Sequence, residues 1–209
     1  MSTEPFVSVV CPTHGRVKFL PHLLHFRSQI YPRDRLELLV LDDSEVPTQL
    51  FEGDASLRYF AKRNRLNKLS KGEIIVCFDD DYYGPDRVRL AVNALTKSGS
   101  EFGGTADVLY YFPRLQRFVR FNNKICAAAM FYSRDYGNSH AFLEGRRHGA
   151  ESSFRTGKNI VVLANDKSFV AIGHSANTVS KRLVARFPAQ PEKAEDLFPP
   201  DYLAFLRTL

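Results

Sequence analysis

The segment VCFDDDYYGPD, residues 76–86, decides how the chain is expected to fold. Its three consecutive carboxylates, at residues 79–81, come directly after the apolar run at residues 74–78, which is typical of a strand buried on both faces. Adjacent like charges repel at short range, so something at the end of this strand must make three anions tolerable. A bound divalent cation is the obvious candidate. A solvated turn that caps the next helix is the plainer alternative.

The composition indicates one soluble domain. The chain has 209 residues, of which 44% are hydrophobic, enough for one sizeable core. A net charge of +6 suits a polyanionic ligand: nucleic acid, an acidic membrane surface or the phosphates of a nucleotide. The three cysteines fit neither a disulfide framework nor a zinc site, and we expect buried free thiols. Without a signal peptide or a membrane-spanning run, a cytoplasmic protein is expected.

Alternating strand and helix patterns predict an α/β fold for the first half of the chain. Strands are expected over residues 6–11, 36–41 and 73–78, with a short one around 57–60, and helices over 19–26, 62–69 and 86–95. Such alternation predicts a largely parallel sheet flanked by helices, whose ligands lie at the carboxyl ends of the strands. Thr13, the pair Asp42-Asp43 and the three aspartates all fall at such ends.

The second half is expected to mix antiparallel strands with loops. Strands are predicted over residues 105–111, 117–121, 126–132, 160–163 and 169–172, the first two forming a hairpin around Pro113. From residue 181 onward, prolines interrupt the pattern and predict a mobile or peripheral arm that ends in a helix over 201–209. Because that helix is apolar, the chain is expected to be part of a longer multidomain protein.

Asp79 and Asp81 are the expected ligands of Mn²⁺ or Mg²⁺. Hard cations of this kind take carboxylate oxygens together with phosphate oxygens and water. Residues two apart in an extended segment point the same way, so these two can converge on one ion while Asp80 points toward a ribose hydroxyl or a basic neighbour. A haloacid-type phosphatase also places an Asp-x-Asp pair after a strand. In those phosphatases the strand lies near the start of the chain, and Tyr82 and Tyr83 of this protein do not fit the residues that follow the pair.

Four segments in order resemble one enzyme family. They read VSVVCPTHGR (7–16), SQIYPRDRLELLVLDDSE (28–45), AKRNRLNKLSKGE (61–73) and IIVCFDDDYYGP (74–85). Together they resemble glycosyltransferase family 2, which has the nucleotide-diphospho-sugar transferase fold called GT-A, and the likeness covers about residues 6–95. Departures at His14-Gly15, at residues 65–67 and at Tyr82 bear on nucleotide contacts rather than on the fold. The strand-borne triplet with its aromatic and basic surroundings also resembles an enzyme encoded by a large algal virus.

The resemblance implies an architecture and an activity. The whole chain, 1–209, would be one α/β GT-A domain with a mostly parallel central sheet flanked by helices and a smaller antiparallel acceptor-side sheet. Residues 1–100 would be the nucleotide-sugar-binding half, 101–180 the acceptor and catalytic half, and 181–209 a C-terminal arm and helix. The activity would be metal-dependent, inverting transfer of a hexosyl or deoxyhexosyl group from a UDP-sugar donor to a glycan hydroxyl, with no nucleic-acid partner.

The resemblance also implies roles on the donor side. Pro12, Thr13 and Arg16 would line the nucleotide pocket. Asp42 or Asp43 would accept a hydrogen bond from the base imide, which favours uracil. The remaining donor-side residues would be Arg65 and Lys71 at the base or phosphates, Asp80 at the ribose, and Asp79, Asp81 and His174 at the metal. Plainer explanations are a helix-capping Thr13 and a surface-charged Arg65.

On the acceptor side, the resemblance implies that Glu151 is the catalytic base. Glu151 lies in HGAESSF, residues 148–154, with Phe154 at the family's apolar position. Inverting transfer needs one group that takes the proton of the acceptor hydroxyl. Asp135 and Glu144 are lesser candidates, and a helix-start carboxylate stabilised by the helix dipole is the plainer explanation. His174 lies in GHSANT, and the following Lys181 and Arg182 would belong to a lid over the phosphates.

Two other classes of protein stay open at this point. A sugar nucleotidyltransferase shares the fold and the metal, but opens with a Gly-rich G-x-G-x-R loop that residues 11–16 do not match. A non-catalytic glycan-binding or nucleic-acid-binding module would explain the positive charge and the aromatic residues. Such a module does not need a carboxylate cluster, which repels phosphates unless a metal is bound.

Overall fold

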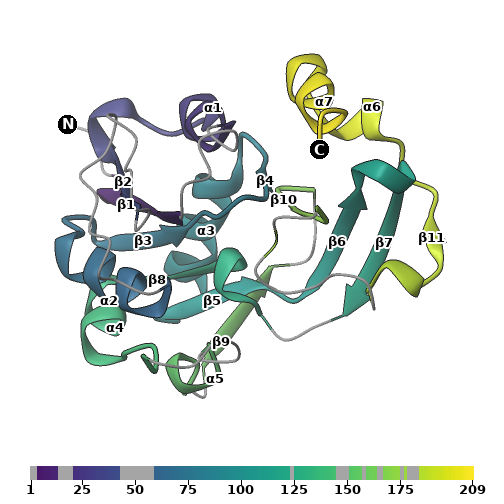
Figure 1. Cartoon of the computed structure of the whole chain (residues 1–209). Coiled ribbons are helices and arrows are strands. Elements are labelled where there is room, and N and C mark those ends of the chain that lie inside the picture. Colours follow the sequence, from purple (N-terminus) through teal and green to yellow (C-terminus); the bar gives the residue numbers. More distant parts are fainter. Residues whose placement is uncertain are drawn as a thin grey trace.

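The computed structural model has two β-sheets side by side, with helices around them (Figure 1). It describes residues 4–13, 21–42, 59–122, 125–144, 151–156, 159–163, 167–174, 177 and 184–209. For residues 21–24, 59–61, 122 and 151 it describes the backbone alone. Within these described parts, no helix is both long and apolar enough to cross a membrane.

The central sheet has six strands in the order β2-β1-β3-β8-β5-β9. They are β1 (Val7–Thr13), β2 (Leu36–Asp42), β3 (Ile74–Cys77), β5 (Phe102–Thr105), β8 (Met130–Ser133) and β9 (Ile160–Leu163). β1 runs parallel to β2 and β3, and β5 runs parallel to β9, whereas β8 is antiparallel to both of its neighbours. The expected α/β class with a mostly parallel central sheet is confirmed.

Both faces of the central sheet are covered, as the unbroken apolar runs predict. The helices of this half are α1 (Pro21–Ser28), α2 (Tyr59–Leu69), α3 (Arg87–Ser98), α4 (Arg134–Ser139) and α5 (Glu151–Phe154). Alternate residues of β3 point to opposite sides. Ile75 and Cys77 pack with side chains of α2, α4 and α5, whereas Ile74 and Val76 pack with α3.

The second sheet has five strands in the order β11-β7-β6-β10-β4. They are β4 (Tyr82–Tyr83), β6 (Asp107–Phe112), β7 (Arg117–Asn122), β10 (Phe169–Ile172) and β11 (Ala189–Gln190). β6 and β7 form the predicted antiparallel hairpin, and β10 lies parallel to β6 and antiparallel to β4. Because β4 follows β3 after four residues, the acidic segment between them connects the two sheets directly.

A buried arginine holds the two sheets together from inside. The guanidinium of Arg87 donates to Thr105 Oγ1 at 2.9 Å and to the carbonyl of Ala129 at 2.6 Å. It also lies over the rings of Phe131 and Phe169, at 5.5 and 5.6 Å from their centroids. Phe131 belongs to the central sheet and Phe169 to the second sheet, so one cation joins both.

Two local predictions are corrected by the structure. Tyr59 and Phe60 begin helix α2 and do not form the short strand expected around residues 57–60, of which the first two lie outside the described residues. Residues 127–129 form a 3₁₀ helix, so β8 starts only at Met130. Aromatic residues favour strands only weakly when packing decides, and alanines favour helical turns. Cys11 and Cys77 are buried free thiols as expected, while Cys126 is half-buried.

The C-terminal segment packs onto the second sheet. Helices α6 (Ala194–Leu197) and α7 (Pro200–Leu206) cover one face of it (Figure 1). Leu203 and Leu206 are buried there, and the ring of Tyr202 lies 4.6 Å from His25 of α1 and 5.3 Å from Tyr82. The predicted terminal helix is therefore present, but the expectation of a mobile or peripheral arm is wrong for residues 184–209. Spacing alone did not show that the apolar side chains had a sheet face to cover.

Replacing Leu206 with alanine tests whether this helix belongs to the core. The side chain is 1% exposed, so its loss should lower the free energy of unfolding by about 3 kcal/mol. Urea unfolding followed by circular dichroism measures the change. Thr208→Ala, at an exposed position two residues further on, is the control and should change it by less than about 0.5 kcal/mol. Equal effects of the two changes would mean that α7 adds nothing to the core.

Candidate functional site

The carboxyl ends of β1, β2 and β3 meet at one edge of the central sheet. Thr13 at the end of β1 pairs in register with Asp42 at the end of β2. On the other side of β1, the N–H of Phe78 donates to the carbonyl of Val10 at 2.9 Å, and residues 79–81 follow immediately. Asp42 is 1% exposed. The sequence prediction that these polar residues share one edge is therefore realised in the fold.

The acidic triplet, Asp79–Asp81, is bent, and its side chains diverge. Asp79 Oδ2 accepts a hydrogen bond from Arg63 Nη2 at 3.1 Å. Asp80 Oδ2 lies 3.2 Å from His174 Nε2. The alternation expected of an extended segment does not apply here, because the backbone turns at the second and third carboxylates.

The third carboxylate binds the backbone of the second sheet. Asp81 Oδ1 accepts from the N–H of Ile172 at 2.9 Å, and Asp81 is 8% exposed. Ile172 is the last residue of β10, two positions before His174. The backbone N–H of His174 in turn donates to Asn177 Oδ1 at 2.8 Å. The triplet therefore holds the end of β10 against the end of β3.

The side chain of Tyr83 supports the backbone of the triplet from the buried side. Its hydroxyl accepts from the N–H of Asp79 at 2.7 Å and donates to the carbonyl of Ala128 at 3.0 Å. Its ring stacks on Phe78, with the centroids 3.9 Å apart and the planes 5° from parallel. Tyr83 is fully buried, so this phenol fixes the backbone at the first carboxylate.

The charges of the triplet give its surroundings a negative electrostatic potential. Burial raises the pKa of Tyr83 well above the ordinary range of a phenol, and the charges of Asp81 and Asp79 raise it further. The pKa of Tyr202 is raised in the same way, by burial first and then by charges of the triplet. Burial also raises the pKa of the Cys11 thiol, with Asp79 contributing next. A cation near the triplet would meet a favourable potential.

Two basic side chains of α2 reach this edge, and the sequence analysis did not select them. Lys62 and Arg63 are each 1% exposed, and Lys62 Nζ donates to the carbonyl of Thr13. Arg65, which was selected, is exposed on the same helix. The helical periodicity of the sequence could have identified these two buried cations. Leu66 marks the buried face, and the residues three and four positions before it share that face.

Residues of the right donor chemistry for Mn²⁺ or Mg²⁺ lie at this edge. Such ions are commonly held by one or two carboxylates plus phosphate oxygens and water. Among the described residues, no group of three or more His, Cys, Asp and Glu side chains is arranged to hold a metal. Asp79, Asp81 and His174 therefore do not form a complete cage by themselves, and an ion held here would also take oxygens from a bound phosphate.

Helix α5, which begins at Glu151, is anchored to the same region through aromatic rings. Phe154 is fully buried and stacks on Phe142, with ring centroids 4.0 Å apart. The ring of Phe142 lies 6.0 Å from the Arg63 guanidinium that holds Asp79. Packing of Phe154, the last residue of α5, thus connects this helix to the acidic triplet, although the side chain of Glu151 lies outside the described part.

The other predicted site residues are placed as follows. Glu144, a lesser candidate for the base, has Oε1 bound by Asn64 Nδ2 at 2.9 Å, and Asp135 is exposed on α4. Pro12 is buried in β1. Lys71 precedes β3, and its N–H donates to Glu37 near the start of β2, so it lies at the opposite end of the sheet from the triplet. The predictions for Arg16, Asp43, Lys181 and Arg182 fall outside the described residues.

No protein-family model matches the chain, and no curated protein matches its sequence. Solved structures do share its fold. Residues 1–349 of TarS from S. aureus give a TM-score of 0.61 at 16% identity, over 80% of this chain and 60% of that one. TarS in complex with UDP-GlcNAc gives 0.62 at 15% identity, over 82% and 60%.

A mannosyltransferase gives a similar match. PcManGT from Pyrobaculum calidifontis, in complex with GDP-Man and Mn²⁺, gives a TM-score of 0.62 at 16% identity, over 88% of this chain and 59% of that one. At these identities the likeness shows the fold alone. The chain spans about 60% of the length of the first structures that it matches.

Changing Tyr83 to phenylalanine tests the brace beneath the triplet. Removing the hydroxyl leaves the buried N–H of Asp79 and the carbonyl of Ala128 without this partner, and should lower the free energy of unfolding by about 2 kcal/mol. Urea unfolding measures this. Tyr82→Phe is the matched control, because the structure gives the neighbouring hydroxyl no hydrogen bond within the described residues. A Tyr83→Phe protein as stable as that control would show that the brace is not needed.

Proposed function

We propose that the chain is a metal-dependent, inverting glycosyltransferase of the GT-A class, similar to family 2, that moves a sugar from a UDP-sugar to a glycan hydroxyl. One observation carries the proposal: the acidic triplet lies at the carboxyl end of β3 in a fold shared with solved structures that hold UDP-GlcNAc or GDP-Man with Mn²⁺. Open α/β sheets bind their ligands at this edge.

The donor nucleotide would lie across the ends of β1 and β2. Pro12, Thr13 and Asp42 line this edge, and Arg16 and Asp43 follow it in sequence. A buried carboxylate such as Asp42 can accept from the imide of uracil. Lys62, buried beside the carbonyl of Thr13, would add a positive charge on the side of the diphosphate.

Asp79, Asp81 and His174 would hold Mn²⁺ or Mg²⁺, which when bound stabilises negative charge on the departing diphosphate. One carboxylate oxygen of Asp79 accepts from Arg63, and one of Asp81 accepts from the N–H of Ile172. Those contacts orient the carboxylates before substrate arrives. The pairing of Asp80 with His174 at 3.2 Å holds the imidazole just beyond the end of β10.

Glu151 would take the proton from the attacking hydroxyl. The geometry of single displacement places this base on the face of the sugar opposite the leaving diphosphate. Helix α5 is fixed through Phe154 and Phe142 against Arg63, so its first residue is held at a set position relative to the triplet. The hydroxyl oxygen attacks the anomeric carbon, the bond to the diphosphate breaks, and the carboxylate keeps the proton.

Asp81→Asn tests the metal-binding role without removing the contact with β10. The amide oxygen can still accept from the N–H of Ile172, but the charge is gone, so Mn²⁺-dependent release of UDP from a panel of UDP-sugars should fall about a hundredfold. Asp34→Asn, at an exposed position, is the control. Unfolding by urea checks that Asp81→Asn remains folded. Wild-type rates in a folded Asp81→Asn protein would remove Asp81 from the site.

Glu151→Gln tests the base. The change keeps the size of the side chain and removes its ability to take a proton, so transfer to a mixture of methyl glycosides should fall at least about a hundredfold. Calorimetric affinity for the UDP-sugar should stay within about twofold. The control is Glu101→Gln, at an exposed position before β5. Transfer that survives the change would reassign the base, with Glu144 and Asp135 tested next.

A further inference from the structure

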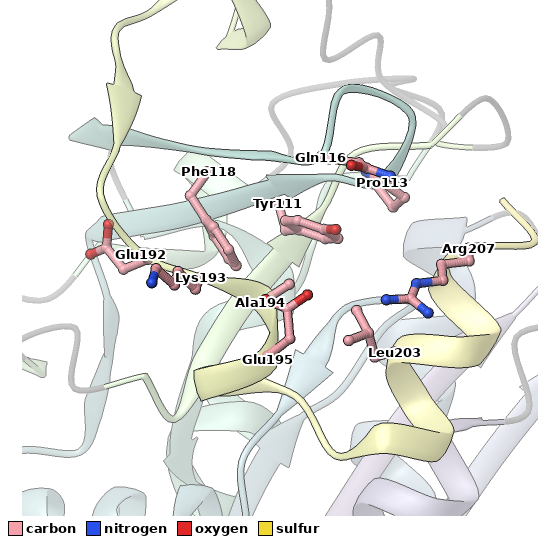
Figure 2. A pocket seen from close by; sticks show the side chains of 10 residues that line it. All are labelled: Tyr111, Pro113, Gln116, Phe118, Glu192, Lys193, Ala194, Glu195, Leu203 and Arg207. Atoms are coloured by element: carbon pink, nitrogen blue, oxygen red, sulfur yellow. The ribbon is translucent and has the colours of Figure 1, made fainter.

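A cavity lies between the β6–β7 hairpin and helices α6 and α7. Its volume is about 270 Å³ (Figure 2). Drug-sized ligands occupy cavities of roughly 300–1,000 Å³, so this one suits a smaller molecule, of the size of one sugar ring. Its floor is apolar: Phe118, Ala194 and Leu203 line it and are buried.

Three polar groups converge above this floor. Figure 2 shows the carboxylate of Glu195 and the guanidinium of Arg207 pointing toward one another, with the Tyr111 hydroxyl near the space between them. Within the described residues, none of these three side chains has a hydrogen-bond or ion-pair partner. The side chains of Gln116 and Lys193, also on the cavity wall, have none there either. The wall above the floor is polar and open to solvent, because Gln116, Lys193, Glu195 and Arg207 are exposed.

The charges around the cavity are mixed. Lys193 and Arg207 supply two cations, and Glu195 and Glu192 supply two carboxylates. Glu192 Oε1 accepts from Arg120 Nη2 at 3.0 Å, while its Oε2 is buried with no hydrogen bond in the part of the protein described. A simple anion would be attracted by one pair and repelled by the other. The cavity therefore favours an uncharged polar ligand over phosphate.

Tyr111 contributes a hydrogen-bond donor at neutral pH. Burial raises the pKa of its phenol, and the charge of Glu195 raises it further, against a smaller opposing effect of Arg207. The wall therefore offers donors at the tyrosine and the arginine, and acceptors at the glutamate. Sugar hydroxyls both donate and accept, and so can satisfy both kinds of group at once.

We propose that this cavity is a saccharide-binding subsite that holds one sugar ring of a glycan against Tyr111, Glu195 and Arg207. Its place beside the reaction site gives it a use, and this use rests on the proposed function. The carbonyl of Tyr111 accepts from the N–H of Gly173 at 2.8 Å, next to His174. A glycan held here would lie one strand away from His174, because β6 pairs with β10.

Saturation-transfer NMR tests the subsite without nucleotide or metal. The probes are methyl glycosides of glucose, galactose, mannose, N-acetylglucosamine and rhamnose, each titrated into the full chain. At least one should receive saturation from the wild type. Arg207→Ala should weaken that binding about tenfold, because it removes a charged hydrogen-bond donor. Tyr111→Phe, which removes only one hydroxyl, should weaken it about threefold to tenfold.

Lys97→Ala, at an exposed position of α3 away from the cavity, is the control and should bind as the wild type does. The subsite would be overturned if no glycoside received saturation, or if wild type and both cavity variants gave equal saturation transfer. Displacement of the sugar by equimolar inorganic phosphate would overturn it as well. UDP release from UDP-sugars is measured separately on the wild type. If that release fails while sugar binding at the cavity persists, the proposed catalytic function fails and the subsite stands.

Discussion

Three adjacent carboxylates at the end of a buried strand are the constraint on which the structure depends. Unpaired like charges repel strongly in a region of low dielectric, and in this fold each of the three has a different partner. The fold supplies Arg63 from α2, His174 after β10 and the backbone N–H of Ile172. Satisfying the triplet therefore draws a helix of the central layer and a strand of the second sheet to the same point.

The same arrangement gives the site its stiffness. The turn after β3 is held from below by the hydroxyl of Tyr83, and β4, which carries that tyrosine, is itself a strand of the second sheet. Arg87 joins the two sheets deeper in the core. A site built between two sheets that are joined at several points can hold carboxylates in fixed directions, which a catalytic role demands. The cavity lined by Tyr111 and Phe118 lies on the face of the second sheet opposite Tyr83.

The sequence predicted the sheet edge better than the contacts on it. The ends of β1, β2 and β3 were located to within two residues, because apolar runs stop there. The cations at those strand ends, Lys62 and Arg63, were not selected from the sequence. They resemble any charged residues of a helix until the packing of Leu66 shows which side of the helix is buried. Likewise, neither the packing of α7 on the second sheet nor the cavity beneath it was foreseen, since both depend on which face of the β6–β7 hairpin remains uncovered.

By itself, the sequence determined the alternation of the main strands and helices in the first half, the position of the carboxylates after a buried strand and the mixed α/β class. These follow from local periodicity, which short segments carry within themselves. The tertiary structure alone decided that the triplet bends, that Asp80 faces His174 while Asp81 binds β10, and that Lys71 lies at the far end of the sheet. Directions of side chains at a bend depend on partners distant in the chain, and no local pattern records those partners.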